Sequence, residues 1–170
     1  MFKGLTQRVQ RILSTGSQIE ARRFNSNQVL PEHVIIAMLR EGAGTACKAL
    51  LSLKIDLVEF RHTLEKTVHQ SPGVLIQGEL GPSDRTKYML ELATDEARSI
   101  GNDYLGTEHL LFAALREKDS CVQLYLNQRV VDIETLKEEV RTICRYSPDN
   151  GIFFVHRGQP DSKQMETQIK

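Results

Sequence analysis

The chain has 170 residues, 40% of them hydrophobic, which is enough to bury a core without help from disulfides or a metal. Its 22 basic and 22 acidic residues cancel, and we find neither the basic excess of a nucleic-acid binder nor the Lys/Arg-rich helix face of a membrane-surface protein. No run approaches the ~20 apolar residues of a membrane span, and residues 1–10 are too polar for a secretory signal, so we expect a cytoplasmic protein without a nucleic-acid or membrane partner.

Four helices are predicted in the first half of the chain. The first opens at Thr6, whose hydroxyl can cap the free N–H groups of a helix start, and apolar residues follow it at helical spacing. The second begins at Pro31, because proline suits a first helical turn, and it is broken at Gly42. The third covers residues 45–53, and the fourth begins near Asp56, another capping residue.

The second half follows the same plan after a loop. Residues 69–81 are predicted to form the loop that joins the halves, because this segment contains Pro72, Gly73, Gly78 and Gly81. The four helices that follow are predicted to begin at or near Ser83, Thr107, Cys121 and Asp132. Residues 147–170 are dominated by Pro, Gly, Asp, Ser and Gln, and we interpret them as a tail or linker, with 152–155 as the one candidate strand.

The two halves are copies of one unit, related by an offset of 76 residues. Glu20-Ala21-Arg22 returns as Glu96-Ala97-Arg98, and the run that starts at Glu32-His33 returns at Glu108-His109. Both runs end alike, at Arg40-Glu41 and at Arg116-Glu117. We therefore predict an all-α domain over residues 1–146, with about eight helices in two four-helix repeats, 2–68 and 82–146, packed around a pseudo-twofold axis.

The repeated residues resemble the motif of the Clp N-terminal domain, the substrate- and adaptor-binding domain of ClpC- and ClpA-type AAA+ unfoldases. The second copy carries the motif in Asp95-Glu96-Ala97-Arg98 and in the run from Tyr104 to Leu111. The first copy departs from it. Leu30-Pro31 stands where the family usually has Gly-Thr, Asn25 replaces a glycine, and one extra residue lies near Gly16.

The resemblance implies a specific ligand, because each repeat of ClpC-like members carries a pocket for phosphorylated arginine, a degradation mark. A glutamate at the start of the second helix takes the guanidinium, which here means Glu32 and Glu108. The start of the first helix takes the phosphate, which here means the hydroxyl caps Thr6 and Ser83. The chemistry is sound, since a carboxylate accepts two bonds from a guanidinium and a helix N-terminus attracts an anion. A protein adaptor on the same surface is the alternative ligand.

Each of these residues also has a purely structural interpretation. A glutamate in a first helical turn is favoured by the helix dipole by roughly 0.3–1 kcal/mol, and Thr6 and Ser83 serve as caps in any case. His33 and His109 lack a second histidine four residues on, so we expect core or capping histidines and no metal. We interpret Arg40, Arg116 and their neighbouring glutamates as surface charges, and Cys47, Cys121 and Cys144 as small buried hydrophobes in a reducing cytoplasm.

The chain has no GxxxxGK[ST] loop for ATP and no GxSxG elbow, so we expect a recognition module without catalytic activity or cofactor. The sequence leaves open two kinds of protein to which such a module could belong. It is either the front domain of a longer Clp unfoldase, acting with that protein's ATPase ring and peptidase in protein degradation, or a stand-alone accessory that docks on a Clp machine and regulates it. The polar tail suits a tether to an ATPase and favours the first.

Overall fold

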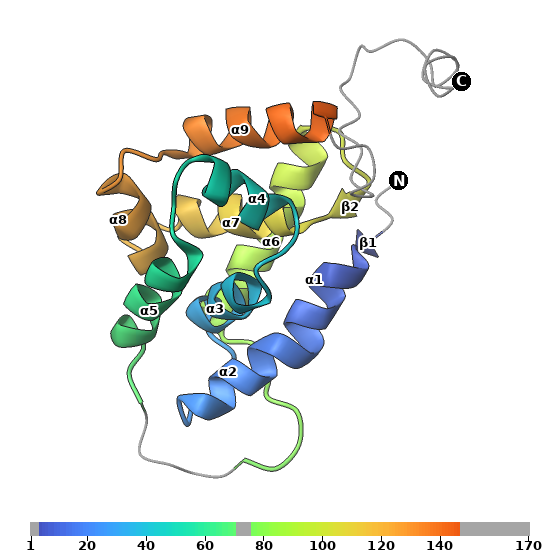
Figure 1. Ribbon diagram of the computed structural model, residues 1–170. Helices are drawn as coiled ribbons and strands as arrows, with labels where there is room; N and C mark the ends of the chain where they lie inside the picture. Colours follow the sequence, from blue (N-terminus) through green and yellow to red (C-terminus); the bar gives the residue numbers. More distant parts are fainter. Residues whose placement is uncertain (1–3, 71–75, 147–170) are drawn as a thin grey trace.

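The computed structural model describes residues 4–70 and 76–146, and Figure 1 shows that these residues form a bundle of helices. The first copy contains β1 (Gly4–Leu5), α1 (Gln7–Arg11), the π-helical segment η1 (Ile12–Gly16), α2 (Ser17–Arg23), α3 (Pro31–Glu41), α4 (Thr45–Ser52) and α5 (Leu57–Thr67). The second copy contains α6 (Asp84–Ser99), β2 (Tyr104–Leu105), α7 (Thr107–Arg116), α8 (Cys121–Asn127) and α9 (Ile133–Tyr146). The predicted all-α class is confirmed. The candidate strand at 152–155 and the predicted tail lie outside the described residues.

Most helix starts use the predicted capping residues. The hydroxyl of Thr6 accepts a hydrogen bond from the Val9 N–H at 3.2 Å, and the carboxylate of Asp56 accepts two from the first turn of α5. The end of α3 is also as predicted, because Gly42 adopts the left-handed conformation with φ +68°. The start of α7 differs: Gly106 is the cap, and Thr107 is the first helical residue.

The extra residue of the first copy is absorbed as a π-helical turn. α1, η1 and α2 form one continuous helix that corresponds to α6 in the second copy (Figure 1). An inserted residue can be accommodated in a helix by a single turn with wider hydrogen bonding. Gly16 lies in this turn close to α3, where a Cβ would come within 3.0 Å of the Ala37 Cβ. The glycine therefore permits the close packing of the widened turn.

The core is built around α3 and α7, which pack against each other across the two copies. Both are buried almost all round: among their fully buried side chains are Ile35, Ile36 and Met38 of α3 and Leu110, Leu111 and Phe112 of α7. The other helices cover them, and Figure 1 shows α1–α2, α5 and α9 on the outside of the bundle. Because helices that are apolar on all sides must be covered on all sides, the two copies share one core.

In each copy an ion pair joins the first helix to the second helix. Arg40 donates to Glu20 at 2.5 Å, and Arg116 donates to Glu96 at 3.0 Å, with Lys137 at 2.9 Å from the same carboxylate. Both carboxylates are buried, and a buried carboxylate is costly unless it is paired. Arg40 and Arg116 are exposed, as predicted for surface charges at the end of the second helix, and each also pairs with a buried carboxylate that the sequence did not indicate.

The pseudo-twofold arrangement is visible in the backbone. β1 pairs in parallel with β2, so that Leu5 lies opposite Leu105. The equivalent contact on the other side is a parallel bridge between Val29 and Pro82. In each case the segment before the first helix of one copy lies beside the segment before the second helix of the other. This reciprocal pairing of the two copies determines which of the predicted site residues lie close together.

Candidate functional site

Each predicted pocket draws its acid and its helix start from different copies. The Thr6 N–H donates to the Leu105 carbonyl at 3.0 Å, which brings the start of α1 beside the start of α7 and its Glu108. The Ser83 N–H donates to the Val29 carbonyl at 2.9 Å, which brings the start of α6 beside the start of α3 and its Glu32. The backbone contacts thus bring each helix start beside the second helix of the other copy: Thr6 lies at the end of the molecule where α7 with Glu108 begins, and Ser83 where α3 with Glu32 begins.

The two hydroxyls act as helix caps. Ser83 Oγ accepts from the Thr86 N–H at 3.2 Å, just as Thr6 accepts from Val9. At the start of α6 the Thr86 hydroxyl makes a second hydrogen bond to the other copy, because it donates to the Val29 carbonyl at 2.7 Å. The structural role proposed for these residues from sequence is therefore present, and it fixes the position of each helix start relative to the acid.

Glu108 is the most unusual side chain of the described residues. It is 0% exposed, and neither of its carboxylate oxygens has a hydrogen-bond partner. His109 is nearby, with 3.8 Å between its Nδ1 and the carboxylate, but burial lowers the histidine's pKa to about 3 and the ring is neutral. Desolvation raises the pKa of Glu108 to about 7. Since buried polar groups almost always find partners, this carboxyl group needs an explanation beyond folding.

Glu32 has a partner, and that partner is a guanidinium. Its Oε1 lies 2.7 Å from Nη2 of Arg85, while its Oε2 is buried without a hydrogen bond. Arg85 also binds Glu117, with 2.6 Å between its Nε and the carboxylate, and the two carboxylates together raise its pKa. A guanidinium thus already occupies the acid of this pocket.

The equivalent arginine of the first copy behaves differently. Arg8 stands two residues after Thr6, as Arg85 stands two residues after Ser83, but it pairs with Glu41. A Cβ at Gly44 would lie 2.8 Å from Arg8 Cδ and 3.0 Å from Thr107 Oγ1, so the arginine passes close to the start of α7. Among the described residues no bond joins it to Glu108. The two pockets are therefore unequal: one acid is neutralised by its own chain and the other is unpaired.

The histidines next to the glutamates cap their own helices, as predicted. His33 Nδ1 accepts from the Leu30 N–H at 2.9 Å, and His109 Nδ1 accepts from the Gly106 N–H at 2.8 Å. His33 also stacks on Phe24, with 5.8 Å between the ring centroids. Both rings are buried, and their role is in the fold.

Sequence reasoning missed the ion pairs that shape the pockets. From the sequence, Arg85 with Lys87 is a short basic segment expected to be solvated or to meet an acidic adaptor, and Glu117 is expected to be a surface charge. A signal was present, since an arginine follows each cap by two residues and a glutamate ends each second helix. The partners lie 32 and 53 residues from Arg85, and the repeat alone does not show that such positions meet.

Over residues 4–70 and 76–146, no helix is both long and apolar enough to cross a membrane. In the same ranges, no three His, Cys, Asp or Glu side chains come together in a way that could hold a metal ion.

Comparison with known proteins places these features in a family. The sequence profile of the Clp repeat (R) N-terminal domain matches residues 4–129 and 81–150. The chaperone protein ClpB of Oceanobacillus iheyensis is 34% identical over 140 residues, and the chloroplastic chaperone protein ClpC of Pisum sativum is 31% identical over 163 residues. The alignments cover 82% and 96% of this chain but only 17% and 18% of those relatives, so the chain spans less than a fifth of their length.

Solved structures support the same fold. The N-domain of ClpV from Vibrio cholerae aligns with a TM-score of 0.69 at 15% identity, over 83% of this chain and 85% of that one. The Hsp104 N-terminal domain from Candida albicans aligns with a TM-score of 0.67 at 15% identity, over 84% of this chain and 92% of that one. With the profile match over most of the chain and relatives above 30% identity, the chain belongs to the Clp N-terminal domain family.

Proposed function

We propose that the chain is a recognition module that binds substrate or adaptor proteins for a Clp ATPase, and that phosphoarginine-marked proteins are among its ligands. On this proposal the module performs no chemistry, and ATP hydrolysis and peptide cleavage belong to the ring and peptidase that it serves in the cytoplasm. The observation that carries the proposal is the unpaired, buried carboxyl group of Glu108, in the first turn of the helix whose start lies beside the start of α1.

The contact between Glu32 and Arg85 supports the choice of a guanidinium ligand. It demonstrates, within one molecule, that a guanidinium can bond to a glutamate at the first turn of the second helix. The helix start contributed by the other copy would meet the anionic part of the ligand, since free N–H groups and the helix dipole favour negative charge there. One ligand with a guanidinium and a phosphate on adjacent atoms would satisfy both.

The two pockets are expected to differ in affinity. A ligand at Glu32 must displace Arg85, whereas a ligand at Glu108 meets a carboxyl group that has no competing partner. We therefore expect the Glu108 pocket to bind more tightly.

Calorimetric titration with a phosphoarginine peptide and with the same peptide unmodified tests the proposal. We expect heat from the phosphorylated peptide alone, a loss of at least about tenfold in affinity for Glu108→Gln, and a smaller loss for Glu32→Gln. Glu91→Gln, an exposed carboxylate on α6, is the matched control and should leave binding unchanged. Equal, negligible heats from both peptides would remove phosphoarginine as the ligand, and a pull-down from source cytosol with the Glu32/Glu108 double variant would then test adaptor binding.

A further inference from the structure

A second surface of the first copy is formed by one side of the continuous helix α1–η1–α2 and by the end of α3. It is a hollow of about 410 Å³ between the π-helical turn and the end of α3. Its lining residues are Arg11, Ile12, Thr15, Gly16, Ile19, Glu20, Ala37, Arg40 and Glu41, and we call this surface the η1 hollow. Gly16 and Ala37, two small residues in close contact, leave the space open.

The η1 hollow has an apolar floor. Ile12 is buried beneath it, whereas Ile19 remains 53% exposed although it is a large hydrophobic residue. Single exposed hydrophobic residues are common, but one that lies beside a hollow lined by Ile12 and Ala37 can bury an apolar side chain from a partner.

The rim of the η1 hollow is positive toward solvent. Glu20 is 2% exposed in its side chain and already binds two arginines, and Glu41 binds Arg8 and also lies 3.6 Å from Arg11. The arginines are more open than the acids they meet: the side chain of Arg11 is 61% exposed and that of Arg40 is 41% exposed. The guanidinium groups of Arg11 and Arg40 therefore lie at the outer surface, the carboxylate of Glu20 lies beneath them, and that of Glu41 is partly exposed beside them.

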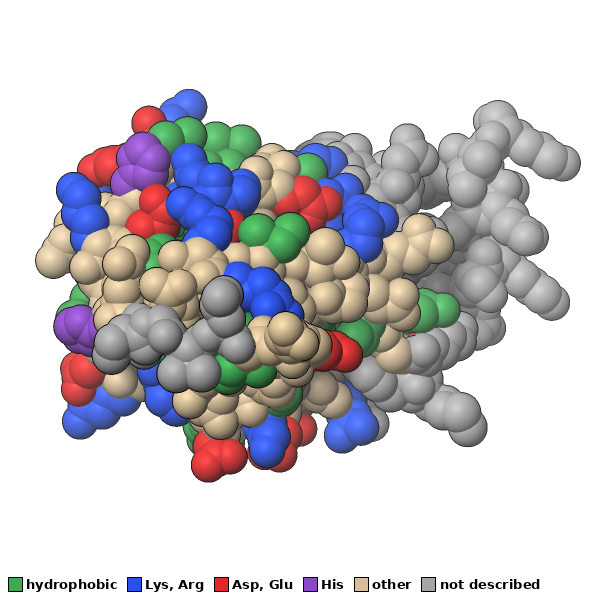
Figure 2. Space-filling model, turned by 90° about the horizontal axis from the view of Figure 1, so that it is seen from below, with side chains coloured by type: hydrophobic (Ala, Val, Ile, Leu, Met, Phe, Trp, Pro, Cys, Tyr) green, Lys and Arg blue, Asp and Glu red, His purple; other side chains and the backbone are tan. Residues whose placement is uncertain are grey.

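The positive charge is a property of the first copy and not of the second. Residues 7–23 contain four arginines and one glutamate, while α6, their equivalent, contains three basic and four acidic residues. Figure 2 looks at the end of the molecule where α2 lies, and blue basic side chains gather over the upper part of this view with acidic ones between them.

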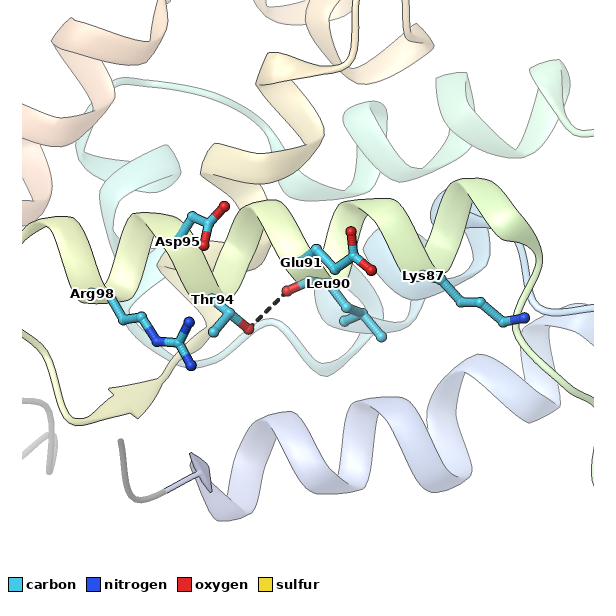
Figure 3. A pocket seen from close by; sticks show the side chains of 6 residues that line it. All are labelled: Lys87, Leu90, Glu91, Thr94, Asp95 and Arg98. Atoms are coloured by element: carbon cyan, nitrogen blue, oxygen red, sulfur yellow. Dashed lines mark hydrogen bonds between the residues drawn. The ribbon is translucent and has the colours of Figure 1, made fainter. Parts of the chain in front are cut away.

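The exposed side of α6 provides an internal comparison. It forms a shallow hollow of about 370 Å³, lined by Lys87, Leu90, Glu91, Thr94, Asp95 and Arg98 (Figure 3). Figure 3 shows Leu90 as the one hydrophobic side chain among charged and polar neighbours of both signs. The α6 hollow lacks the apolar floor of the η1 hollow. Each hollow is lined by two basic and two acidic residues, but Glu91 and Asp95 of the α6 hollow are both exposed, whereas Glu20 of the η1 hollow is buried.

From these features we infer that the η1 hollow is a docking surface for an acidic segment of a partner protein, which places an aliphatic side chain on Ile19 and its carboxylates on Arg11 and Arg40. This inference rests on the proposed function, in which partner proteins dock on the module, and it adds the chemical class of one partner segment. Charge complementarity of this kind guides association and selects against cationic segments.

Fluorescence anisotropy with the full chain tests the inference. The probe is a labelled peptide of Asp and Glu with a leucine at every fourth position, and the control peptide keeps the leucines but has glutamine at every acidic position. We expect the acidic peptide to bind at least about tenfold more tightly than the glutamine peptide, and to weaken as salt rises from about 0.05 to 0.3 M. Arg11→Glu and Ile19→Ser should each weaken binding by at least about fivefold, and both positions are exposed, so the fold should be retained.

Matched variants locate the effect. Lys87→Glu makes the same change of charge on the α6 hollow, and Leu124→Ser removes a hydrophobic residue of similar exposure, 50%, elsewhere, so both should leave binding unchanged. Equal binding of the two peptides, equal losses for Lys87→Glu and Arg11→Glu, or no binding at about 1 mM peptide would overturn the inference. A dimer that Arg11→Glu dissociates in sedimentation would also overturn it, by showing that a second copy occupies the surface. Glu108→Gln should not affect the acidic peptide, which separates this result from the phosphoarginine test.

Discussion

The buried carboxyl group of Glu108 lowers the free energy of unfolding. Its carboxyl group is removed from water without receiving a hydrogen bond, and ionisation of such a group is strongly unfavourable. Natural proteins tolerate strain of this kind chiefly where a ligand later relieves it. The unpaired acid therefore supports the proposal that Glu108 is a binding residue.

The raised pKa of Glu108 makes the stability of the protein depend on pH. In the unfolded chain the carboxyl ionises with a pKa near 4.5, and in the folded protein with a pKa of about 7. Between these values the folded state binds the additional proton, so the contribution of Glu108 to the free energy of unfolding falls as pH rises from about 4.5 to 7 and then levels off. His109 contributes in the opposite direction, because burial lowers its pKa from 6.5 to about 3 and the unfolded chain therefore binds the histidine's proton at these pH values. His33, whose pKa burial also lowers, acts in the same sense. The difference between wild type and Glu108→Gln isolates the contribution of Glu108.

We therefore expect Glu108→Gln, which cannot ionise, to gain stability relative to wild type as pH rises. The difference between pH 5 and pH 8 should amount to about 3 kcal/mol at most. Urea unfolding of both proteins at the two pH values measures it, with the exposed Glu91→Gln as a control that shows no such change. A difference that stays constant across pH would show that Glu108 is solvated or paired in the folded protein.

At the scale of single elements, the π-helical turn is where the two copies differ most. The same helix is regular in α6 and contains an extra residue in α1–η1–α2. The insertion was apparent from the sequence, because the cap-to-glutamate spacing is longer by one residue in the first copy. The structure of the insertion was not apparent from the sequence, because a looped-out residue and a π-helical turn both lengthen the spacing by one residue. The choice depends on Gly16 and Ala37 being small enough to pack together.

Gly16→Ala tests this packing. An alanine normally stabilises a helix relative to glycine by up to about 1 kcal/mol. Here its Cβ would lie 3.0 Å from that of Ala37, and a crowded contact in a packed region typically costs about 1–3 kcal/mol. We expect net destabilisation of about 1 kcal/mol, measured by chemical unfolding. Gly81→Ala is the control, because an added Cβ there meets no atom within 4 Å and should change stability little. A stabilised Gly16→Ala would show that η1 has room to spare.

At the scale of the whole molecule, the sequence predicted the units but not how they combine. Helix starts, the repeat and the family follow from local patterns, such as Thr6 and Ser83 at equivalent caps. The reciprocal contacts of β1 with β2 and of Val29 with Pro82 are made by backbone atoms, which leave no side-chain pattern. These backbone contacts place the first helix of one copy beside the second helix of the other, and they bring Arg85 to Glu32. Neither arrangement can be inferred from the sequence alone.

The shared core leads to a prediction about the two halves as separate chains. α3 and α7 are buried almost all round and pack against each other, so each copy alone would leave a large apolar area of its central helix in water. We expect residues 1–68 and residues 82–146, prepared separately, to show no cooperative thermal unfolding by circular dichroism, and an equimolar mixture to recover it. A full-length chain cut once after residue 73 should stay folded, because the cut removes none of the contacts between α3 and α7. Cooperative unfolding of either half alone would mean that each repeat has a sufficient core, and that the pockets between them form by docking of two preformed units.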